Sequence, residues 1–368
     1  MARLPGGRRL RAELEQSLRQ RDQLARRLDK SEQQRHALRG RLDAQRQRSR
    51  AVQSDEIVLE QVLPLRAAAI VAANHDGRAA RESAFAEKCG PYREALIDID
   101  TAPMGTERVA VGGLTWWIPA RPGESEGMAQ RLARRRRLPL RELLDTRELA
   151  QGRVMIDIGA NVGTTSIPRV LLGDFACVYA IEPDPGNYAC LVRNVVANGV
   201  RGLVLPDRMA IGDVEGEVVL RSMKSGTHHL VTRAADVRED ERVTVPCVTL
   251  DGWIERMRID LSEVFFIKSD TQGWDARVLA GAARVLAQKH IAWQVEFSPA
   301  MLQRSGCSLE DVYALLERHF THFIDLRSEQ GTHVRATRDL PGALAYVGTP
   351  DRAYTNLLLY SAAPVQTT

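Results

Sequence analysis

Long hydrophobic runs and paired cysteines are both missing from this sequence. No apolar stretch approaches the roughly 18 residues that a membrane-spanning helix needs, so we expect no membrane span. The first residues include arginines but no apolar core of the kind found in signal peptides. The five cysteines form no Cys-x-x-Cys pair and no cluster with histidines, which favours reduced thiols and no metal site. These absences together predict a cytoplasmic protein.

Aromatic residues are also scarce, and the basic first part of the chain has none. Residues 1–50 hold 15 Lys and Arg against 6 Asp and Glu, so their net charge is +9 and the rest of the chain carries −5. A basic arm therefore precedes a mildly acidic body. Because the arm offers no aromatic side chains on which bases stack, we do not expect nucleic-acid binding.

Proline is absent and glycine is rare between residues 8 and 52. Leucine pairs recur every two heptads, at Leu10 and Leu14, Leu24 and Leu28, and Leu38 and Leu42. With polar residues between the pairs, this spacing predicts a helical extension over residues 1–54 with an interrupted a/d stripe. Two interpretations stay open: a coiled coil that forms a homodimer or docks a partner, and a solvated basic helix. Residues 55–107 are expected to form a helical connector.

A Gly-x-Gly-x-x-Gly turn is absent too, but a different glycine turn is present. Residues 154–165 read VMIDIGANVGTT, an apolar run that predicts a buried strand followed by a turn. Gly159 lets the backbone leave the strand sharply, and Gly163 lets a ligand approach a helix start. The motif is Asp-x-Gly-x-Asn-x-Gly, from Asp157 through Asn161. An acid inside the strand suits a cationic ligand such as S-adenosylmethionine better than a pyrophosphate. The alternative is a plain tight turn.

The next predicted strand supports a pocket at the glycine turn that binds a nucleotide-like cofactor. The apolar run Cys177–Ile181 ends at Glu182, which lies 23 positions after Gly159. At this spacing the acid lies at the tip of the second strand, where its two oxygens can accept both ribose hydroxyls. The alternative is that Glu182 caps the helix that starts near Pro185.

Six segments share their residues and their order with one known family. They are IDIGANVG (156–163), YAIEPDPGNYACLVRNVVANG (179–199), MAIGD (209–213), VTLDGWI (248–254), FFIKSDTQGWDARVLAGA (265–282) and WQVEFSP (293–299). On these residues the chain resembles the FkbM family of S-adenosylmethionine-dependent methyltransferases. The sequence departs from the family at Gln272, where an acid is usual, and at Asp275, where a longer Glu is usual.

The resemblance implies a fold, a cofactor and a reaction. The fold is a doubly wound, seven-stranded, Rossmann-like class I methyltransferase sheet with its last strand antiparallel, spanning residues 108–362. The cofactor is S-adenosyl-L-methionine, and the reaction is O-methylation of a sugar, a glycan or a natural product. A base amino group is disfavoured as acceptor, because residues 269–273 read SDTQG where an Asn/Asp-Pro-Pro-aromatic tetrad would stand.

The residue pattern itself also predicts a parallel α/β sheet. We expect strands near residues 154–158, 177–182, 203–210, 264–269, 291–297, 322–326 and 355–361, and helices near 164–172, 185–198, 274–288 and 308–320. Residues 109–119 alternate as in a β-hairpin that contains Trp116 and Trp117. These two tryptophans either pack inside the protein or cover the mouth of the active site, where sugars stack on aromatic faces.

The candidate site lies at the carboxyl ends of the parallel strands. The expected cofactor-binding residues are Asp157, Gly159, Asn161, Gly163, Glu182, Ala210, Ile211 and Asp270. The candidate catalytic residues are Asp270, Glu296 and His229. Asp270 is either a general base or the partner of the cofactor's amino group. Glu296 either faces the substrate or pairs with Lys268 or an arginine, and His229 either acts as a base or is incidental. Asp251, Asp270 and Glu296 form a candidate oxygen cluster, but no metal is expected.

We therefore predict an S-adenosylmethionine-dependent O-methyltransferase. One alternative is a catalytically inactive, methyltransferase-like binding module. The departures from the family pattern at Gln272 and Asp275 are the reason to retain this alternative. The other is a dinucleotide-dependent oxidoreductase, against which the missing Gly-x-Gly-x-x-Gly turn argues.

Overall fold

The computed structural model describes residues 106–111, 114–119, 146, 149–150, 152–221, 229–231, 238–239, 242–328 and 333–361. The chain divides into two units, and all of these residues belong to the second, Val58–Thr368. The expected helical extension and all but the end of the expected connector lie outside the described residues. The coiled coil and its homodimer or docking role therefore stay predictions.

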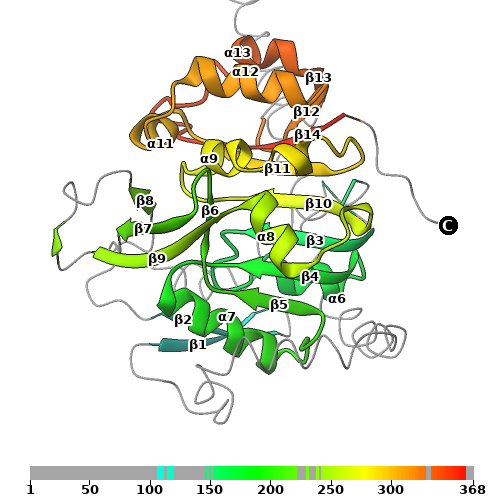
Figure 1. Ribbon diagram of the computed structural model, residues 1–368, viewed down its shortest axis with the longest axis vertical. Coiled ribbons are helices and arrows are strands. Elements are labelled where there is room, and N and C mark those ends of the chain that lie inside the picture. The colour runs from blue at the N-terminus through cyan, green and yellow to red at the C-terminus, as the bar shows by residue number, and fades with distance from the viewer. Residues whose placement is uncertain are drawn as a thin grey trace, which may run out of the picture. The chain divides into compact units, whose positions relative to one another are not determined.

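An eight-stranded sheet forms the centre of the domain (Figure 1). In spatial order its strands are β13 (Val334–Ala336), β12 (His322–Asp325), β14 (Thr355–Tyr360), β11 (Ala292–Phe297), β10 (Val264–Ser269), β3 (Gly152–Ile158), β4 (Phe175–Ile181) and β5 (Val204–Asp207). From β11 to β5 all neighbours are parallel, whereas β14 is antiparallel to both of its neighbours. The expected antiparallel last strand is confirmed.

Among the described residues the main sheet has eight strands, where seven were expected. Strand β13 pairs with β12 and adds an antiparallel eighth strand at the edge of the sheet. It is only three residues long and none of its residues is buried. A short exposed edge strand lacks the apolar run by which the others were predicted.

Both faces of the sheet are buried, as expected for parallel strands. Every residue of β10 and of β11 is buried. Met155 belongs to one hydrophobic core cluster and its neighbour Ile156 to another, because successive side chains point to opposite faces of a strand.

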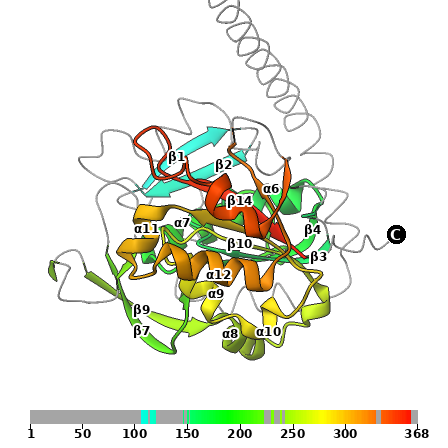
Figure 2. The ribbon, with the colours of Figure 1, turned by 90° about the horizontal axis from the view of Figure 1, so that it is seen from above.

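Different helices cover the two faces (Figure 2). The first cluster contains side chains of α6 (Ser166–Leu171) and α7 (Pro185–Ala197), together with the β-hairpin. The second contains side chains of α8 (Leu250–Met257), α9 (Asp275–Ala280), α10 (Ala283–Leu286), α11 (Pro299–Arg304) and α12 (Leu309–His319). The smaller elements are η4 (Leu261–Glu263), η5 (Thr337–Asp339) and α13 (Leu340–Ala343). Among the described residues, none of these helices has both the length and the apolar character needed to cross a membrane.

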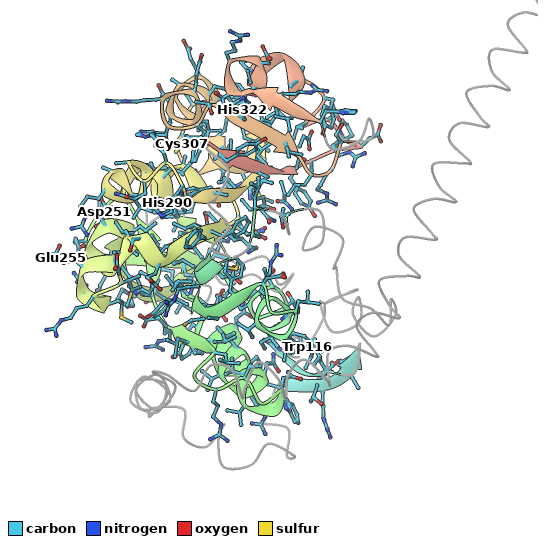
Figure 3. The ribbon with its side chains drawn as sticks, turned by 90° about the vertical axis from the view of Figure 1, so that its right-hand side faces the viewer. Trp116, Asp251, Glu255, His290, Cys307 and His322 are labelled. Carbon is cyan, nitrogen blue, oxygen red and sulfur yellow. The ribbon has the colours of Figure 1, made fainter. Side chains whose placement is uncertain are left out.

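The predicted hairpin is confirmed. Strands β1 (Thr106–Val111) and β2 (Leu114–Pro119) pair in antiparallel fashion. Trp116 and Trp117 are almost completely buried, so they pack inside the protein and do not offer a stacking face to a sugar. Figure 3 shows Trp116 and Asp251 on opposite sides of the domain, which agrees with the hairpin and α8 covering opposite faces of the sheet.

A second sheet was not predicted. It has four strands in the order β6 (Ala210–Gly212), β9 (Arg242–Thr249), β7 (Gly216–Arg221) and β8 (His229–Val231). The single strand expected near residues 203–210 is therefore wrong: its first part is β5 of the main sheet, and Ala210 begins β6 of the second. Strand β9 contains Pro246, which cannot donate a ladder hydrogen bond and so argues against a strand in the sequence.

The helix expected near residues 274–288 is also divided. It breaks between α9 and α10 at Gly281, where a Cβ atom would lie 1.9 Å from the carbonyl oxygen of Gly212. Close backbone packing thus requires glycine here. Helix α12 is confirmed, and Ser308 caps its start by accepting the backbone N–H of Asp311 at 3.0 Å.

Candidate active site

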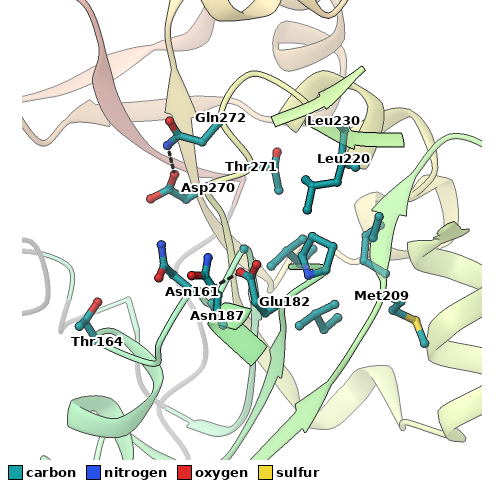
Figure 4. A pocket seen from close by; sticks show the side chains of 17 residues that line it. Asn161, Thr164, Glu182, Asn187, Met209, Leu220, Leu230, Asp270, Thr271 and Gln272 are labelled. Atoms are coloured by element: carbon teal, nitrogen blue, oxygen red, sulfur yellow. Dashed lines mark hydrogen bonds between the residues drawn. The ribbon is translucent and has the colours of Figure 1, made fainter. Parts of the chain in front are cut away.

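A cavity of about 240 Å³ lies at the carboxyl ends of β3, β4 and β10 (Figure 4). Its lining residues are Ile158, Gly159, Ala160, Asn161, Thr164, Ile181, Glu182, Pro183, Asn187, Met209, Ala210, Ile211, Leu220, Leu230, Asp270, Thr271 and Gln272. Of the predicted cofactor-binding residues, the cavity brings together Gly159, Asn161, Glu182, Ala210, Ile211 and Asp270. Their contact with a cofactor stays a prediction.

The glycine loop after β3 is held close to both neighbouring strands. The backbone N–H groups of Gly159 and Ala160 donate to the carbonyl oxygen of Ile181, at 2.9 and 3.0 Å. Gly159 has a φ of +75°, and a Cβ atom there would lie 2.0 Å from the carbonyl oxygen of Asp270. Only glycine combines this backbone conformation with this close approach.

Glu182 is fixed at the tip of β4 by two backbone donors. Its Oε2 accepts the N–H of Asn161 at 2.8 Å, and its Oε1 accepts the N–H of Asp184 at 3.0 Å. Burial is the main cause that raises the pKa of Glu182 to about 7. The helix-capping role belongs to Asp184, whose side chain accepts the N–H of Asn187 at 2.8 Å. Glu182 is therefore available to the cavity.

Asp157 does not line the cavity, in contrast to the prediction. Its side chain is completely buried, and its Oδ1 lies 3.1 Å from Nζ of Lys268. Ser166 donates its hydroxyl to the other carboxylate oxygen at 2.6 Å. Burial alone would lower the pKa of Lys268, but the charges of Asp157 and Asp270 raise it above its ordinary value. Asp157 thus balances a buried cation beneath the site.

Gly163 does not line the cavity either. Its φ is +91°, and a Cβ atom there would lie 2.8 Å from a methyl group of Leu191 in α7. The missing side chain lets helix α7 pack against the loop. The structure therefore supplies a packing reason for this glycine where the sequence suggested a ligand.

Three polar side chains meet at the other end of the cavity. Nε2 of Gln272 lies 3.2 Å from Oδ1 of Asp270 and 3.2 Å from Oε2 of Glu296. Nζ of Lys268 lies 3.7 Å from Oδ2 of Asp270. Burial raises the pKa of Glu296 well above its ordinary value, and the charges of Asp270 and Asp275 raise it further. Glu296 therefore holds its proton at neutral pH.

Asp275 organises the loop between β10 and α9. Its Oδ1 accepts the hydroxyl of Ser269 at 2.5 Å and the N–H of Thr271 at 3.3 Å. Its Oδ2 accepts the N–H of Gly273, also at 3.3 Å. Burial is the first cause that raises the pKa of Asp275 to about 6. The short side chain that departs from the family pattern is thus fully used inside the loop.

The second sheet supplies an apolar wall that the sequence did not reveal. Leu220 of β7 and Leu230 of β8 line the cavity beside the predicted Ala210 and Ile211. Each leucine lies in a separate strand of a sheet with no recognised motif, so only the pairing of β7 with β8 brings them together. His229 begins β8, and its side chain lies outside what the structure describes. Its catalytic role stays a prediction.

The candidate oxygen cluster of Asp251, Asp270 and Glu296 does not form. The carboxylate of Asp251 accepts the backbone N–H groups of Arg284 and Val285, at 2.8 and 3.2 Å, at the start of α10. Within the described ranges, no three His, Cys, Asp or Glu side chains gather in a way that could hold a metal ion.

Comparison with known proteins identifies one family. The model of the methyltransferase FkbM domain matches residues 157–329. A solved methyltransferase FkbM from Methylobacillus flagellatus is similar, with 19% identity over 57% of this chain and 44% of that chain and a TM-score of 0.36. TYW2 of P. horikoshii in complex with MeSAdo is 12% identical over 71% of this chain and 73% of that chain, with a TM-score of 0.33. The tRNA methyltransferase TrmK of B. subtilis is 12% identical over 61% and 68%, with a TM-score of 0.32. No curated protein matches the chain.

The family match, and not the similarity to solved structures, carries the assignment. The chain spans less than half the length of the M. flagellatus protein, and all three TM-scores are below one half. The matched range includes the glycine loop, Glu182, Asp270 and Glu296, which are the residues that build the two ends of the site. Residues 157–329 therefore form a methyltransferase domain of the FkbM family.

Proposed function

We propose that this protein is an S-adenosylmethionine-dependent O-methyltransferase that acts on a hydroxyl group of a sugar, a glycan or a natural product. The observation that carries the proposal is a single cavity whose two ends hold different polar side chains. Glu182, held by backbone donors, lies at one end, and Asp270 with Gln272 lies at the other. The glycine loop lies between them.

The lining residues fit S-adenosylmethionine by their chemistry. A carboxylate has about four acceptor sites. On Glu182 two of them accept backbone N–H groups and one accepts the Asn187 side chain, which leaves a site for a ribose hydroxyl. Ile211, Leu220 and Leu230 provide an apolar surface for the adenine ring. Asp270 supplies negative charge for the ammonium or sulfonium group. When bound, the cofactor supplies a methyl group that is already activated by its attachment to a positively charged sulfur.

A hydroxyl acceptor must also lose its proton, which requires a base beside the cavity. The Asp270 side chain is 36% exposed, so an incoming hydroxyl can reach it. In the base role, the O–H bond of the acceptor breaks and its proton moves to a carboxylate oxygen of Asp270, while the electron pair stays on the acceptor oxygen. In the second role, Asp270 instead holds the ammonium group of the cofactor.

Calorimetric titration of the full chain with S-adenosylmethionine, and with NAD as a control, tests the proposal. Saturable binding of S-adenosylmethionine alone is the expected result. Binding of NAD alone would favour the oxidoreductase, and binding of neither would overturn the cofactor assignment. Binding without methyl transfer to any hydroxyl in a broad acceptor screen would favour the inactive binding module.

Asp270→Asn separates the two roles of Asp270. Turnover is expected to fall in either role. If Asp270 is only the base, the affinity for S-adenosylmethionine is retained, whereas loss of an ammonium partner weakens binding. Unchanged turnover would remove Asp270 from the mechanism.

A further inference from the structure

Gln272 lies between two carboxyl groups that come from different parts of the sheet. Its Nε2 is within 3.2 Å of Oδ1 of Asp270, just after β10, and of Oε2 of Glu296, in β11. In both contacts the NH₂ group of Gln272 donates to a carboxyl oxygen. The NH₂ group carries two hydrogens, one for each carboxyl group. Figure 4 shows the link to Asp270 at the cavity.

The backbone at Gln272 adopts a strained conformation, and this conformation places the side-chain amide. Gln272 has a φ of +56°, in the left-handed region that residues other than glycine rarely adopt. Gly273 follows with a φ of +96°, and a Cβ atom there would lie 2.6 Å from Met301. The turn is therefore tightly determined by its surroundings, and the Gln272 side chain is aimed into the gap between the two acids.

The two acids differ in their surroundings. Oδ2 of Asp270 has Nζ of Lys268 at 3.7 Å, and its side chain is partly exposed to the cavity. Glu296 is nearly buried, and burial together with the charge of Asp270 raises its pKa. The charges of Lys268 and Arg327 lower the pKa of Glu296, but by less. Asp270 is thus open to an acceptor, whereas Glu296 is buried next to it and holds a proton.

We propose that Gln272 is a positioning residue that ties Asp270 to Glu296, so that the linked pair holds Asp270 in place to receive an acceptor's proton. The inference rests on the proposed function with Asp270 in the base role. The acceptor's O–H bond breaks, the proton goes to a carboxylate oxygen of Asp270, and the electron pair stays on the acceptor oxygen. Throughout, each amide hydrogen of Gln272 holds one carboxyl group in place, and Glu296 keeps the proton that it already has.

Titration of Glu296 by carboxyl ¹³C NMR tests the link in the full chain without cofactor or acceptor. Glu296→Gln identifies the resonance. Gln272→Met keeps the length of the side chain but removes both donors. Because a donor to a carboxylate favours its charged form, this variant is expected to raise the titration midpoint of Glu296 by roughly half to one pH unit. The matched control is Gln303→Met on the exposed surface of α11, which is expected to leave the midpoint unchanged.

A purely structural role would give a different result. If Gln272→Met lowers the unfolding temperature but leaves the midpoint of Glu296 unchanged, Gln272 only stiffens the loop and the proposal is overturned. With an acceptor in hand, Gln272→Met is expected to lower kcat and shift the pH profile of kcat. In a Glu296→Gln background that effect of Gln272→Met should shrink, and an equal loss of kcat in both backgrounds would contradict a pair. Absence of methyl transfer in the wild type would count against the proposed function, whereas the NMR midpoint decides the Gln272 link itself.

Discussion

The backbone N–H of Asn161 donates to Oε2 of Glu182 at 2.8 Å, which joins the glycine loop after β3 to the tip of β4. Asn161 adopts a φ of +54° to make this contact. Asparagine tolerates the left-handed region better than most residues with a side chain. The loop and the acid therefore form one unit, and the protonation state of Glu182 is expected to govern both.

Cofactor binding is expected to depend on pH through Glu182. The pKa of Glu182 is about 7 in the domain, and the carboxylate accepts a ribose hydroxyl better than the protonated acid does. Below pH 7 the Kd of S-adenosylmethionine should therefore rise by up to about tenfold per pH unit. Calorimetry between pH 5.5 and 7.5 measures this, with Glu182→Gln as a control that should show no such slope. A flat wild-type profile would contradict the role of Glu182.

The same group should also affect stability. The pKa of Glu182 rises from 4.5 to about 7 on folding, so the folded chain binds more protons than the unfolded chain between these values. The stability of the wild type relative to Glu182→Gln should therefore fall as pH rises through this window, by about 3 kcal/mol in total. Urea unfolding of both variants at pH 4.5 and pH 8 provides the comparison, and a difference that does not change with pH would argue against burial of the charge.

Gly159→Ala should be far more damaging than an ordinary glycine substitution. The new Cβ would lie 2.0 Å from the carbonyl oxygen of Asp270, so the β3 and β10 loops must separate. Gly199 has a similar φ of +69° but nothing within 4 Å of its Cβ position, which makes Gly199→Ala a matched control. The control should cost about 1–2 kcal/mol through backbone strain alone. Gly159→Ala should cost clearly more and abolish cofactor binding, as measured by urea unfolding and calorimetry; equal costs would show that the loops yield easily.

The parts of the fold that the sequence predicted correctly are those that depend on a pattern of neighbouring residues along the chain. Strands β3 and β4 are continuous apolar runs that end in Asp157-x-Gly159 and in Glu182, so their type and their common edge followed from the chain itself. The second sheet depends on pairing between residues that are distant in sequence. Strand β9 was not predicted because it contains Pro246, which argues against a strand. The break at Gly281 depends on an approach to Gly212 that no local pattern reveals.

The candidate site also contains features that the sequence predicted and features that it did not. Glu182 and Asp270 line the cavity as strand-end positions predicted. Asp157 also stands in its strand as expected, but its direction depends on Lys268, which is its cross-strand neighbour in β10. The link from Gln272 to Glu296 needs β11 beside β10 and a left-handed turn, and neither could be obtained from spacing alone.

Lys268→Met should destabilise the domain by leaving a buried carboxylate without its cation. Asp157 is completely buried, and removal of one partner of a buried ion pair typically costs about 3–5 kcal/mol. The double variant Asp157→Asn with Lys268→Met removes both charges and should be more stable than Lys268→Met alone. Unfolding in urea measures both variants. Simple additivity of the two single substitutions would contradict a tight pair.

Asn194 should matter for cofactor binding although it lies outside the cavity. Its Nδ2 donates to the carbonyl oxygen of Val162 in the glycine loop at 2.8 Å and to that of Trp117 at 3.0 Å. Asn198 makes two similar bonds to Thr115 of the hairpin, but none that reaches the glycine loop is found among the described residues. Asn194→Ala leaves buried groups without partners, at about 1–3 kcal/mol each.

The two asparagine variants form a matched pair. Both should loosen the hairpin and lower the unfolding free energy. Only Asn194→Ala should also weaken S-adenosylmethionine binding, by several-fold, because only Asn194 holds Val162. Equal affinities of the two variants in calorimetry would show that the hairpin does not support the loop.

The position of β14 has a consequence for how the protein is made. This strand lies between β11 and β12, yet it is the last of the eight to leave the ribosome. Until then β11 presents unpaired N–H and C=O groups along one edge, and the core lacks Leu357 and Leu359. Strands β5, β4, β3, β10 and β11 are contiguous neighbours and can assemble while synthesis continues. Glu296 of β11, paired with Asn356 of β14, thus acquires its buried surroundings only after the glycine loop and Glu182 already have theirs.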